Sequence, residues 1–206
     1  QSNIPILVGT VDRKIDSLGN KLFFNSTIFM KPKKNYDLYS KIHLVPFAEY
    51  DLVPEFLHPL MRLNLNIDRG IFVKGEDFKV FEWNGIRFSD LICYESSFAR
   101  YSREFSKRGA KILMIQANDG WLGNSAGPHQ HFSSAILRAI ENNLPVVRSG
   151  NTGISGVIYP SGIVKNYKKL NTRAIFVEKV PIYSKASFYS KYGDFFAIIS
   201  FVIFLF

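Results

Sequence analysis

The sequence has a single cysteine, Cys93, among its 206 residues. One cysteine excludes an internal disulfide, so the sequence says little about the redox state of its compartment. The four histidines do not form a convincing metal site, because His129 and His131 are two positions apart and would point to different faces of a helix. We therefore expect structural or surface histidines, and neither a metal nor a cofactor.

The chain also lacks a recognisable nucleic-acid module. It has no aromatic RNA-binding signature, no zinc-ligand spacing and no basic helix, and its lysines and arginines are spread from Arg13 to Lys191. This argues against nucleic acid as a partner, despite a formal net charge of +9. Such a charge is typical of a solvated basic surface, or of a surface that faces an anionic membrane.

The C-terminal apolar run is shorter than the roughly 20 residues that a membrane-spanning helix needs. The run "FFAIISFVIFLF" (195–206) contains one polar side chain, Ser200, and would span about 18 Å as a helix. It predicts either a buried terminal helix or the start of a transmembrane helix. Aromatic residues and a lysine in the preceding flank, 188–194, are typical of a membrane interface.

A hydrophobic content of 47% and a charged content of 21% indicate an ordinary globular protein with one well-buried domain. Apolar runs at 4–11 and 111–117 are typical of strands buried on both faces. Asn84-Gly85 predicts a two-residue hairpin turn between strands at 78–83 and 86–92. The remaining expected elements are strands at 21–30, 144–150, 153–159 and 173–180, and helices at 95–108 and 127–143, the latter with Phe132, Ile136 and Ile140 on one face.

The other segments lack a regular pattern. Residues 31–40 are expected to form a polar surface connection, and 41–50 contains Pro46, which argues against a helix. Residues 51–77 form a long irregular stretch with apolar patches, which is usually functional or mobile in a compact domain. Hairpins mixed with strand–helix–strand units predict a layered α/β domain.

Cys93 stands between a predicted strand and a predicted helix. The amino end of a helix favours thiolate over thiol, and the N–H of Tyr94 would help to hold an oxyanion. A small, inert buried thiol is the alternative. A nearby lysine would stabilise both the thiolate and the developing oxyanion, while a carboxylate moves the proton.

Three segments resemble the nitrilase (carbon–nitrogen hydrolase) superfamily: "YSKIHLVPFAEY" (39–50), "ICYESSF" (92–98) and "NDGWLG…GISGVI" (118–158). Within it they are similar to the extracytoplasmic domain of the apolipoprotein N-acyltransferase family. The resemblance implies a nitrilase-like four-layer α-β-β-α sandwich over residues 1–187. It also implies an interface flank and the start of a transmembrane helix over 188–206.

The resemblance further implies an activity and its residues. A fatty acyl chain would pass from a phospholipid, through a thioester on Cys93, to the N-terminal amino group of a diacylglyceryl-cysteine apolipoprotein. Lys41 matches the lysine of the triad, and Glu49 matches a second glutamate that orients Lys41 or the base. Tyr94 and Glu95 match the two residues after the nucleophile, and Trp121 matches a tryptophan that would contact lipid chains. The enzyme would be a monomer of the bacterial inner membrane, with its catalytic domain on the periplasmic side.

The sequence departs from this pattern at its N-terminus. The family's general-base glutamate is expected before the strand that 4–11 resembles, and the first glutamate here is Glu49. We therefore expect the chain to be a C-terminal fragment that lacks the first strand and helix of the domain, and to turn over slowly or not at all alone. A soluble nitrilase-type amidase and a non-catalytic lipid- or lipoprotein-binding domain remain the alternatives.

Overall fold

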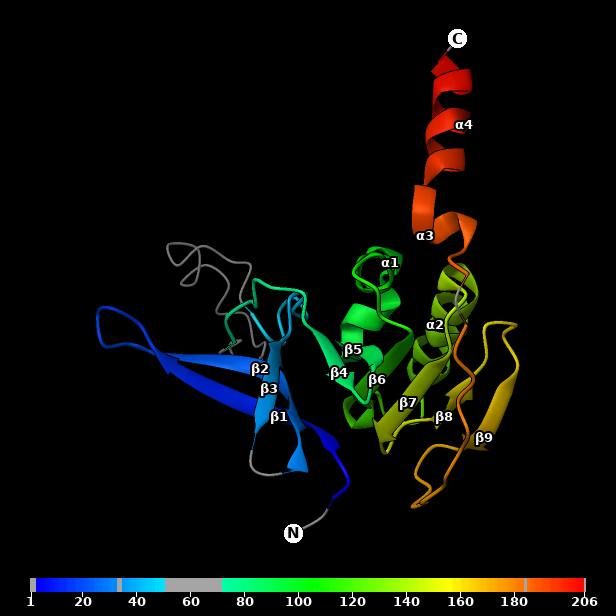
Figure 1. The fold of residues 1–206 in the computed structure, drawn as a ribbon. Helices are drawn as coiled ribbons and strands as arrows, with labels where there is room; N and C mark the ends of the chain where they lie inside the picture. The colour runs from blue at the N-terminus through cyan, green and yellow to red at the C-terminus, as the bar shows by residue number, and fades with distance from the viewer. Residues whose placement is uncertain (1–2, 33–34, 51–71, 184, 206) are drawn as a thin grey trace. The chain divides into compact units, whose positions relative to one another are not determined.

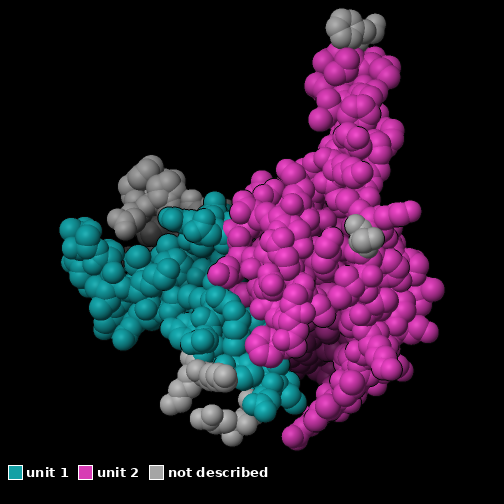
Figure 2. Space-filling model, in the orientation of Figure 1, with its two compact units in different colours: residues 1–77 teal, residues 78–206 magenta. Residues whose placement is uncertain are grey.

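The computed structural model describes residues 3–32, 35–50, 72–183 and 185–205. The chain divides into two compact units, residues 1–77 and 78–206, which are coloured separately in Figure 2. Each unit contains its own β-sheet, as the ribbon shows (Figure 1).

Unit 1 is built on a three-stranded antiparallel sheet in the order β1-β2-β3. Its strands are β1 (Ile6–Ile15), β2 (Lys21–Met30) and β3 (Tyr36–Ser40). Asp16 closes the β1–β2 turn, because its carboxylate accepts the backbone N–H groups of Leu18 and Asn20. Phe24, Phe29 and Tyr39 are buried in this unit.

The structure changes two expectations in unit 1. The expected strand at 4–11 is present as β1, but Ile6, Val8 and Val11 are exposed rather than buried. The reason is that β1 is the edge strand of its sheet and, within the part of the chain that is described, pairs only with β2. Residues 36–40, expected in a surface connection, form β3 because they pair with the end of β2.

Unit 2 is built on a six-stranded mixed sheet in the order β4-β5-β6-β7-β8-β9. Its strands are β4 (Val80–Trp83), β5 (Ile86–Ile92), β6 (Ile112–Asn118), β7 (Val146–Asn151), β8 (Ser155–Ile158) and β9 (Val164–Lys168). The three central strands, β5, β6 and β7, run parallel, and the outer strands are antiparallel. The predicted hairpin is confirmed: Trp83 pairs with Ile86, and Asn84 and Gly85 have φ of +49° and +76°.

Two helices connect the parallel strands of unit 2. Helix α1 (Ala99–Lys107) follows β5, and α2 (Gly127–Asn142) follows β6 (Figure 1). Both crossovers step in the same direction along the sheet, and such connections are right-handed, so both helices cover the same face. Short 3₁₀ turns, η3 (Cys93–Ser97) and η4 (Gly120–Leu122), precede them.

Three details of unit 2 differ from expectation. The first helix begins at Ala99 instead of residue 95, because the chain first makes the η3 turn and Phe98 is extended. Ile140 is exposed, since α2 instead buries a face that includes Phe132, Ala135 and Ala139. The segment 173–180 is not a strand; the strand in this region is β9, reached through the predicted turn at 160–162.

The chain ends in α3 (Phe188–Tyr192) and α4 (Phe195–Leu205). Arg103 of α1 holds α3 by donating to the backbone oxygens of Tyr189 and Lys191. The 11 residues of α4 include no buried side chain. Among the residues described, no helix is both long and apolar enough to cross a membrane, so a complete transmembrane helix is not seen.

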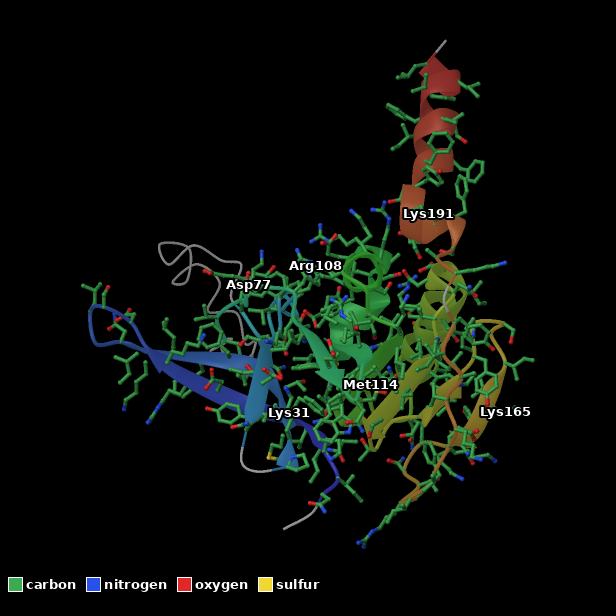
Figure 3. All side chains as sticks on the ribbon, in the orientation of Figure 1. Lys31, Asp77, Arg108, Met114, Lys165 and Lys191 are labelled. Carbon is green, nitrogen blue, oxygen red and sulfur yellow. The ribbon has the colours of Figure 1, made fainter. Side chains whose placement is uncertain are left out.

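Basic side chains occur on separate elements of both units. Lys31 follows β2, Arg108 follows α1, Lys165 belongs to β9, and Lys191 lies in α3 near the base of α4 (Figure 3). This distribution agrees with the spread of cations along the sequence.

Candidate functional site

Cys93 lies at the carboxyl end of the buried strand β5, as the first residue of the η3 turn. Its φ is +52°, a left-handed conformation that residues other than glycine rarely adopt. Such strain persists where the surrounding structure enforces it, and it is concentrated at functional sites. Cys93 as a residue is half-buried.

Three side chains hold the η3 turn. The buried carboxylate of Glu95 accepts the backbone N–H of Ile92 at 2.8 Å, and Ser96 Oγ donates to the carbonyl oxygen of Cys93 at 2.8 Å. Arg138 of α2 donates to the carbonyl oxygens of Ser96 and Ser97. The α1 helix starts only at Ala99, so the turn and not a helix amino end surrounds Cys93, which corrects the expected role of a helix dipole.

A buried polar network lies behind Cys93. His131 of α2 places Nε2 3.0 Å from the Cys93 carbonyl oxygen and 2.9 Å from Ser96 Oγ. Its Nδ1 lies 2.8 Å from Asp119 Oδ1, and Arg148 of β7 donates to Asp119 Oδ2 at 2.7 Å. Cys93 Sγ, an Asp119 oxygen and a His131 ring nitrogen all lie within 4.8 Å of one another.

Asp119 is the anion of this network. Burial raises the pKa of its carboxyl group, but the hydrogen bond from His131 and the Arg148 guanidinium outweigh that effect and leave the pKa below its ordinary value. Burial lowers the pKa of Arg148, and Asp119 opposes that change. Arginine stays charged in proteins at neutral pH, so Asp119 and Arg148 form a buried ion pair.

Cys93, Asp119 and His131 are residue types that bind transition metals. Both oxygens of Asp119, however, already accept hydrogen bonds, one from His131 and one from Arg148. A cation would have to enter beside the Arg148 guanidinium and displace these contacts. The donor set therefore fits a hydrogen-bonded charge network better than a metal centre.

Lys41 and Glu49 form the second cluster of expected site residues, in unit 1. Lys41 follows β3 and is fully buried, and its Nζ donates to both oxygens of Glu49, at 2.9 and 2.7 Å. Asn25 and the backbone N–H of Val45 also donate to Glu49, each at 2.7 Å. Lys41 is thus a buried, paired cation and not a surface lysine.

Two further expected residues lie near the surface of unit 2. The ring of Tyr94 packs edge-on against Phe98, with the ring centres 4.9 Å apart. Trp121 lies in η4 and is 63% exposed, an unusual environment for so large an apolar side chain.

The sequence prediction did not include Asp119, His131 or Arg148 as site residues. Cys93 and Asp119 directly follow β5 and β6, and Arg148 lies within β7, the next parallel strand of the sheet. The carboxyl ends of parallel strands share one edge of a sheet, where ligand sites commonly form. Asp119, two positions after the predicted strand 111–117, was the available signal.

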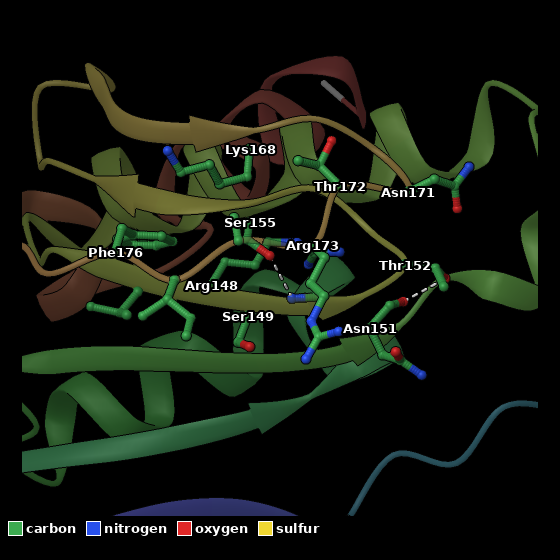
Figure 4. Close-up of a pocket in the computed structure, with 14 residues that line it drawn as sticks. Arg148, Ser149, Asn151, Thr152, Ser155, Lys168, Asn171, Thr172, Arg173 and Phe176 are labelled. Atoms are coloured by element: carbon green, nitrogen blue, oxygen red, sulfur yellow. Dashed lines mark hydrogen bonds between the residues drawn. The ribbon is translucent and has the colours of Figure 1, made fainter.

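A separate cavity of about 730 Å³ lies between β7, β8, β9 and residues 171–176 (Figure 4). Ser149 and Arg173 line it together with Arg148 of the Asp119 network, whereas Cys93, Asp119 and His131 do not.

The ion pair gives the first testable expectation. Replacing Asp119 by Asn should lower the free energy of unfolding at pH 7 by about 3–5 kcal/mol, because Arg148 is left buried without its counter-ion. The Asp119 pKa is lowered by folding, so its contribution is complete above the unfolded value near pH 4 and is lost as the pH falls through the folded value. The difference between the two proteins should therefore shrink in acid, as measured by denaturant titration at several pH values.

The matched control for Asp119→Asn is Glu104→Gln. Glu104 pairs with Arg108 on the partly exposed surface of α1. The control should change stability by no more than about 0.5 kcal/mol. Equal effects of the two substitutions would contradict a stabilising buried pair.

Comparison with known proteins shows where this chain belongs. The carbon–nitrogen hydrolase family model matches residues 1–180. A curated relative from Geobacter metallireducens, named apolipoprotein N-acyltransferase, is 36% identical over 157 residues, which cover 76% of this chain and 30% of the relative. Apolipoprotein N-acyltransferase 1 of Treponema denticola is 31% identical over 97% of this chain and 40% of its own length. The chain thus spans less than half the length of these relatives.

Solved structures agree in fold. An amidase from Nesterenkonia sp. AN1, with the acetamide moiety of fluoroacetamide added at its active-site cysteine, has a TM-score of 0.60 and 19% identity. The match covers 82% of this chain and 58% of the amidase. A carbon–nitrogen hydrolase from Helicobacter pylori G27 also has a TM-score of 0.60, with 14% identity over 81% of this chain and 58% of its own. With its nitrilase-like α/β fold and a family match over residues 1–180, the chain belongs to the carbon–nitrogen hydrolase family.

Proposed function

We propose that this chain carries the catalytic cysteine of a lipoprotein N-acyltransferase. The observation that carries the proposal is Cys93, held in a left-handed conformation at the end of β5 by Glu95, Ser96 and His131. Relatives named apolipoprotein N-acyltransferase, at 31–36% identity, support the proposal that the acyl acceptor is a lipoprotein. The acyl donor is a phospholipid, and the acceptor is the amino group of an N-terminal diacylglyceryl-cysteine.

The reaction has two covalent steps. The Cys93 thiolate attacks the ester carbonyl of the phospholipid, so that a C–S bond forms, the C–O bond breaks and the lysophospholipid leaves with a proton. The acceptor amine then attacks the thioester; a C–N bond forms, the C–S bond breaks and the amine gives up a proton as the thiolate returns. This ping-pong order is the usual consequence of covalent catalysis.

The other expected residues receive roles in this scheme. The Lys41 ammonium stabilises the thiolate and the oxyanion, and Glu49 orients Lys41 through the two hydrogen bonds between their side chains. Glu95 holds the turn that presents Cys93, and the N–H of Tyr94 contributes to the oxyanion site. Trp121 offers an exposed apolar wall for acyl chains.

The C-terminal helices support a membrane location. Phe196, Ile198, Phe201 and Phe204 are each more than 60% exposed, so α4 presents apolar side chains to its surroundings along its length. Leaving such side chains in water is costly, and a lipid phase relieves that cost. We assign the protein to the bacterial inner membrane, with the domain on the periplasmic side and acting as a monomer. Residues 51–71, most of the long irregular stretch with apolar patches, lie outside the described residues.

Membrane contact through α4 can be measured by vesicle flotation. Changing Phe196, Phe201 and Phe204 together to Ser should weaken binding to anionic phospholipid vesicles by about 10³-fold or more, since each buried aromatic contributes about 1.5 kcal/mol or more. The control is Leu137→Ser, which removes an exposed apolar side chain from α2. Unchanged flotation of the triple variant would exclude α4 as a membrane contact.

An amidase acting on a small amide is the second candidate, because the structural neighbours include an amidase. The exposed apolar side chains of Trp121 and α4 favour a lipid substrate instead. One experiment separates the two. The protein, expressed from its own gene, is incubated with phospholipid that carries labelled acyl chains and with a synthetic diacylglyceryl-cysteine peptide.

The proposal expects label first as a thioester on tryptic peptide 88–100, which contains Cys93, and then as an amide on the acceptor peptide. Label that appears only as free fatty acid would identify water as the acceptor and contradict acyl transfer. Protein that binds labelled lipid without forming a thioester would instead indicate a non-catalytic lipid-binding domain.

A further inference from the structure

The outer face of α1 carries cations at helical spacing. Arg100, Arg103 and Lys107 recur at intervals of three and four residues, so their side chains share one face of the helix, and Arg108 follows directly. The opposite face, which includes Phe105, is buried. The exposed face of α1 is therefore basic.

Arg103 fixes this face of α1 against the end of α3. Its guanidinium donates to the backbone oxygens of Tyr189 and Lys191, each at 3.0 Å. It also packs closely against Gly193, where an added Cβ would approach Arg103 Cζ to 2.9 Å. These contacts place the basic face of α1 beside the junction between α3 and α4, within the same unit (Figure 1).

Aromatic side chains gather at the same junction. The ring centre of Phe188 lies 4.7 Å from that of Tyr192 and 5.3 Å from that of Phe196, and the Phe195 ring lies within 6.3 Å of all three. Each of these side chains is more than 40% exposed. Aromatic residues are enriched where a protein passes from water into a membrane. The junction thus has the composition of a membrane interface at the base of α4.

The charges beside this junction are mainly positive. Residues 99–108 and 187–194 contain five lysines and arginines and two acidic residues, which leaves a net charge of +3. Glu104 lies 2.8 Å from Arg108 and 3.9 Å from Lys107, so one carboxylate serves two cations. We call the exposed cations of these segments the basic collar: Arg100, Lys107, Arg108 and Lys191.

We propose that the basic collar binds the anionic headgroups of phospholipids while α4 enters the apolar layer beneath them. An apolar helix beside clustered cations is complementary to an anionic bilayer, which presents a charged surface and then an apolar layer. The inference rests on the proposed membrane location. It adds the headgroup chemistry that is recognised and the face of unit 2 that meets the membrane.

This orientation also bears on the site. Only Phe98 separates α1 from the η3 turn, in which Cys93 is the first residue. A unit that binds lipid through α1 therefore holds this turn near the surface from which the acyl donor comes.

Vesicle flotation at two lipid compositions tests the collar separately from α4. Arg100, Lys107 and Lys191 are changed together to Gln, whereas Arg103 is kept because it holds α3, and Arg108 because it is ion-paired. The triple variant should bind vesicles that contain phosphatidylglycerol about 10²-fold more weakly than the wild type, since each cation near an anionic surface strengthens binding about fivefold. Its binding to vesicles of phosphatidylcholine alone, which carry no net charge, should be unchanged.

The matched control changes Lys165, Lys169 and Lys179 together to Gln. These exposed lysines lie in or after β9, apart from Lys191 (Figure 3), and the change in net charge is the same. The control should bind anionic vesicles within about threefold of the wild type, because charges far from the surface are screened. Wild-type binding of anionic vesicles by the collar variant, or equal losses in both variants, would overturn the proposal.

Salt dependence gives a measurement that needs no variant. The screening length falls from about 10 Å at 0.1 M salt to about 3 Å at 1 M. Wild-type binding to the anionic vesicles should therefore fall towards its value for phosphatidylcholine vesicles, while the binding that α4 contributes persists. Binding to anionic vesicles that does not respond to salt would also overturn the proposal.

Flotation and acyl transfer are separate readouts. A collar-dependent preference for anionic vesicles without acyl transfer would reject the proposed activity and keep this inference. Acyl transfer by a protein that binds charged and uncharged vesicles equally would reject this inference and keep the proposed activity.

Discussion

Replacing Cys93 by Ser should abolish the acyl-enzyme and reduce acyl transfer by about 10⁴-fold or more, the order of loss seen when a covalent nucleophile is removed. A serine hydroxyl at its ordinary pKa is a poor nucleophile without a base built for it. The measurement is labelled thioester on peptide 88–100, followed by labelled amide on the acceptor peptide.

The thermal unfolding of Cys93→Ser must be compared with that of the wild type, because residue 93 has a φ of +52° and both residues must adopt it. Cys93→Ala provides the second variant, with neither thiol nor hydroxyl. Both variants should unfold near the wild-type temperature. If either variant transfers acyl chains at the wild-type rate, Cys93 is not the nucleophile.

Replacing Lys41 by Ala should reduce acyl transfer by about 10²–10³-fold, as expected when one charged stabiliser of an oxyanion is lost. The fold of unit 1 should tolerate the change, because Glu49 keeps the hydrogen bonds from Asn25 and from the backbone of Val45. The side chain of Glu49 is also 14% exposed, so water can replace part of the lost contact. Initial rates of labelled acyl transfer give the measurement.

Lys41→Arg should not restore the rate. The buried Lys41 ammonium fits a site in which it donates to both Glu49 oxygens, and a planar guanidinium differs from it in size and donor geometry. Lys31→Ala is the matched control, since Lys31 forms a partly exposed ion pair with Asp37 in the same unit. Full turnover by Lys41→Ala, beside a normal control, would refute the assignment of Lys41.

Local signals in the sequence determined much of the secondary structure. The strand at 21–30, the Asn84-Gly85 hairpin, the strand near 112–118 and the helix near 127–142 agree with the structure. Each of these depends on neighbouring residues: alternating or continuous apolar positions, a turn pair that accepts positive φ, and apolar spacing of three to four residues. The family segments were also visible without a structure, and the family match over residues 1–180 confirms them.

Features that depend on distant pairing were decided only by the tertiary structure. The apolar residues of β1 suggested a central strand, but its position at the sheet edge leaves Ile6, Val8 and Val11 exposed. Residues 36–40, expected to be part of a surface connection, form a strand through their register with β2. Neither the edge position of β1 nor the pairing of 36–40 can be predicted from the local sequence pattern, because a segment by itself does not specify which strands lie beside it.

The candidate site shows the same division. The sequence alone predicted Cys93, Lys41 and Glu49 as site residues through motifs, and it placed Cys93 at the end of a strand, which is where the structure has it. It did not show that the His131 side chain would contact the Cys93 carbonyl oxygen. Nor did it show that Arg148 and Asp119 would form a buried ion pair beside this contact. These residues are 12 to 38 positions from their partners, and they come together only through the parallel order β5-β6-β7 and the packing of α2 on that sheet.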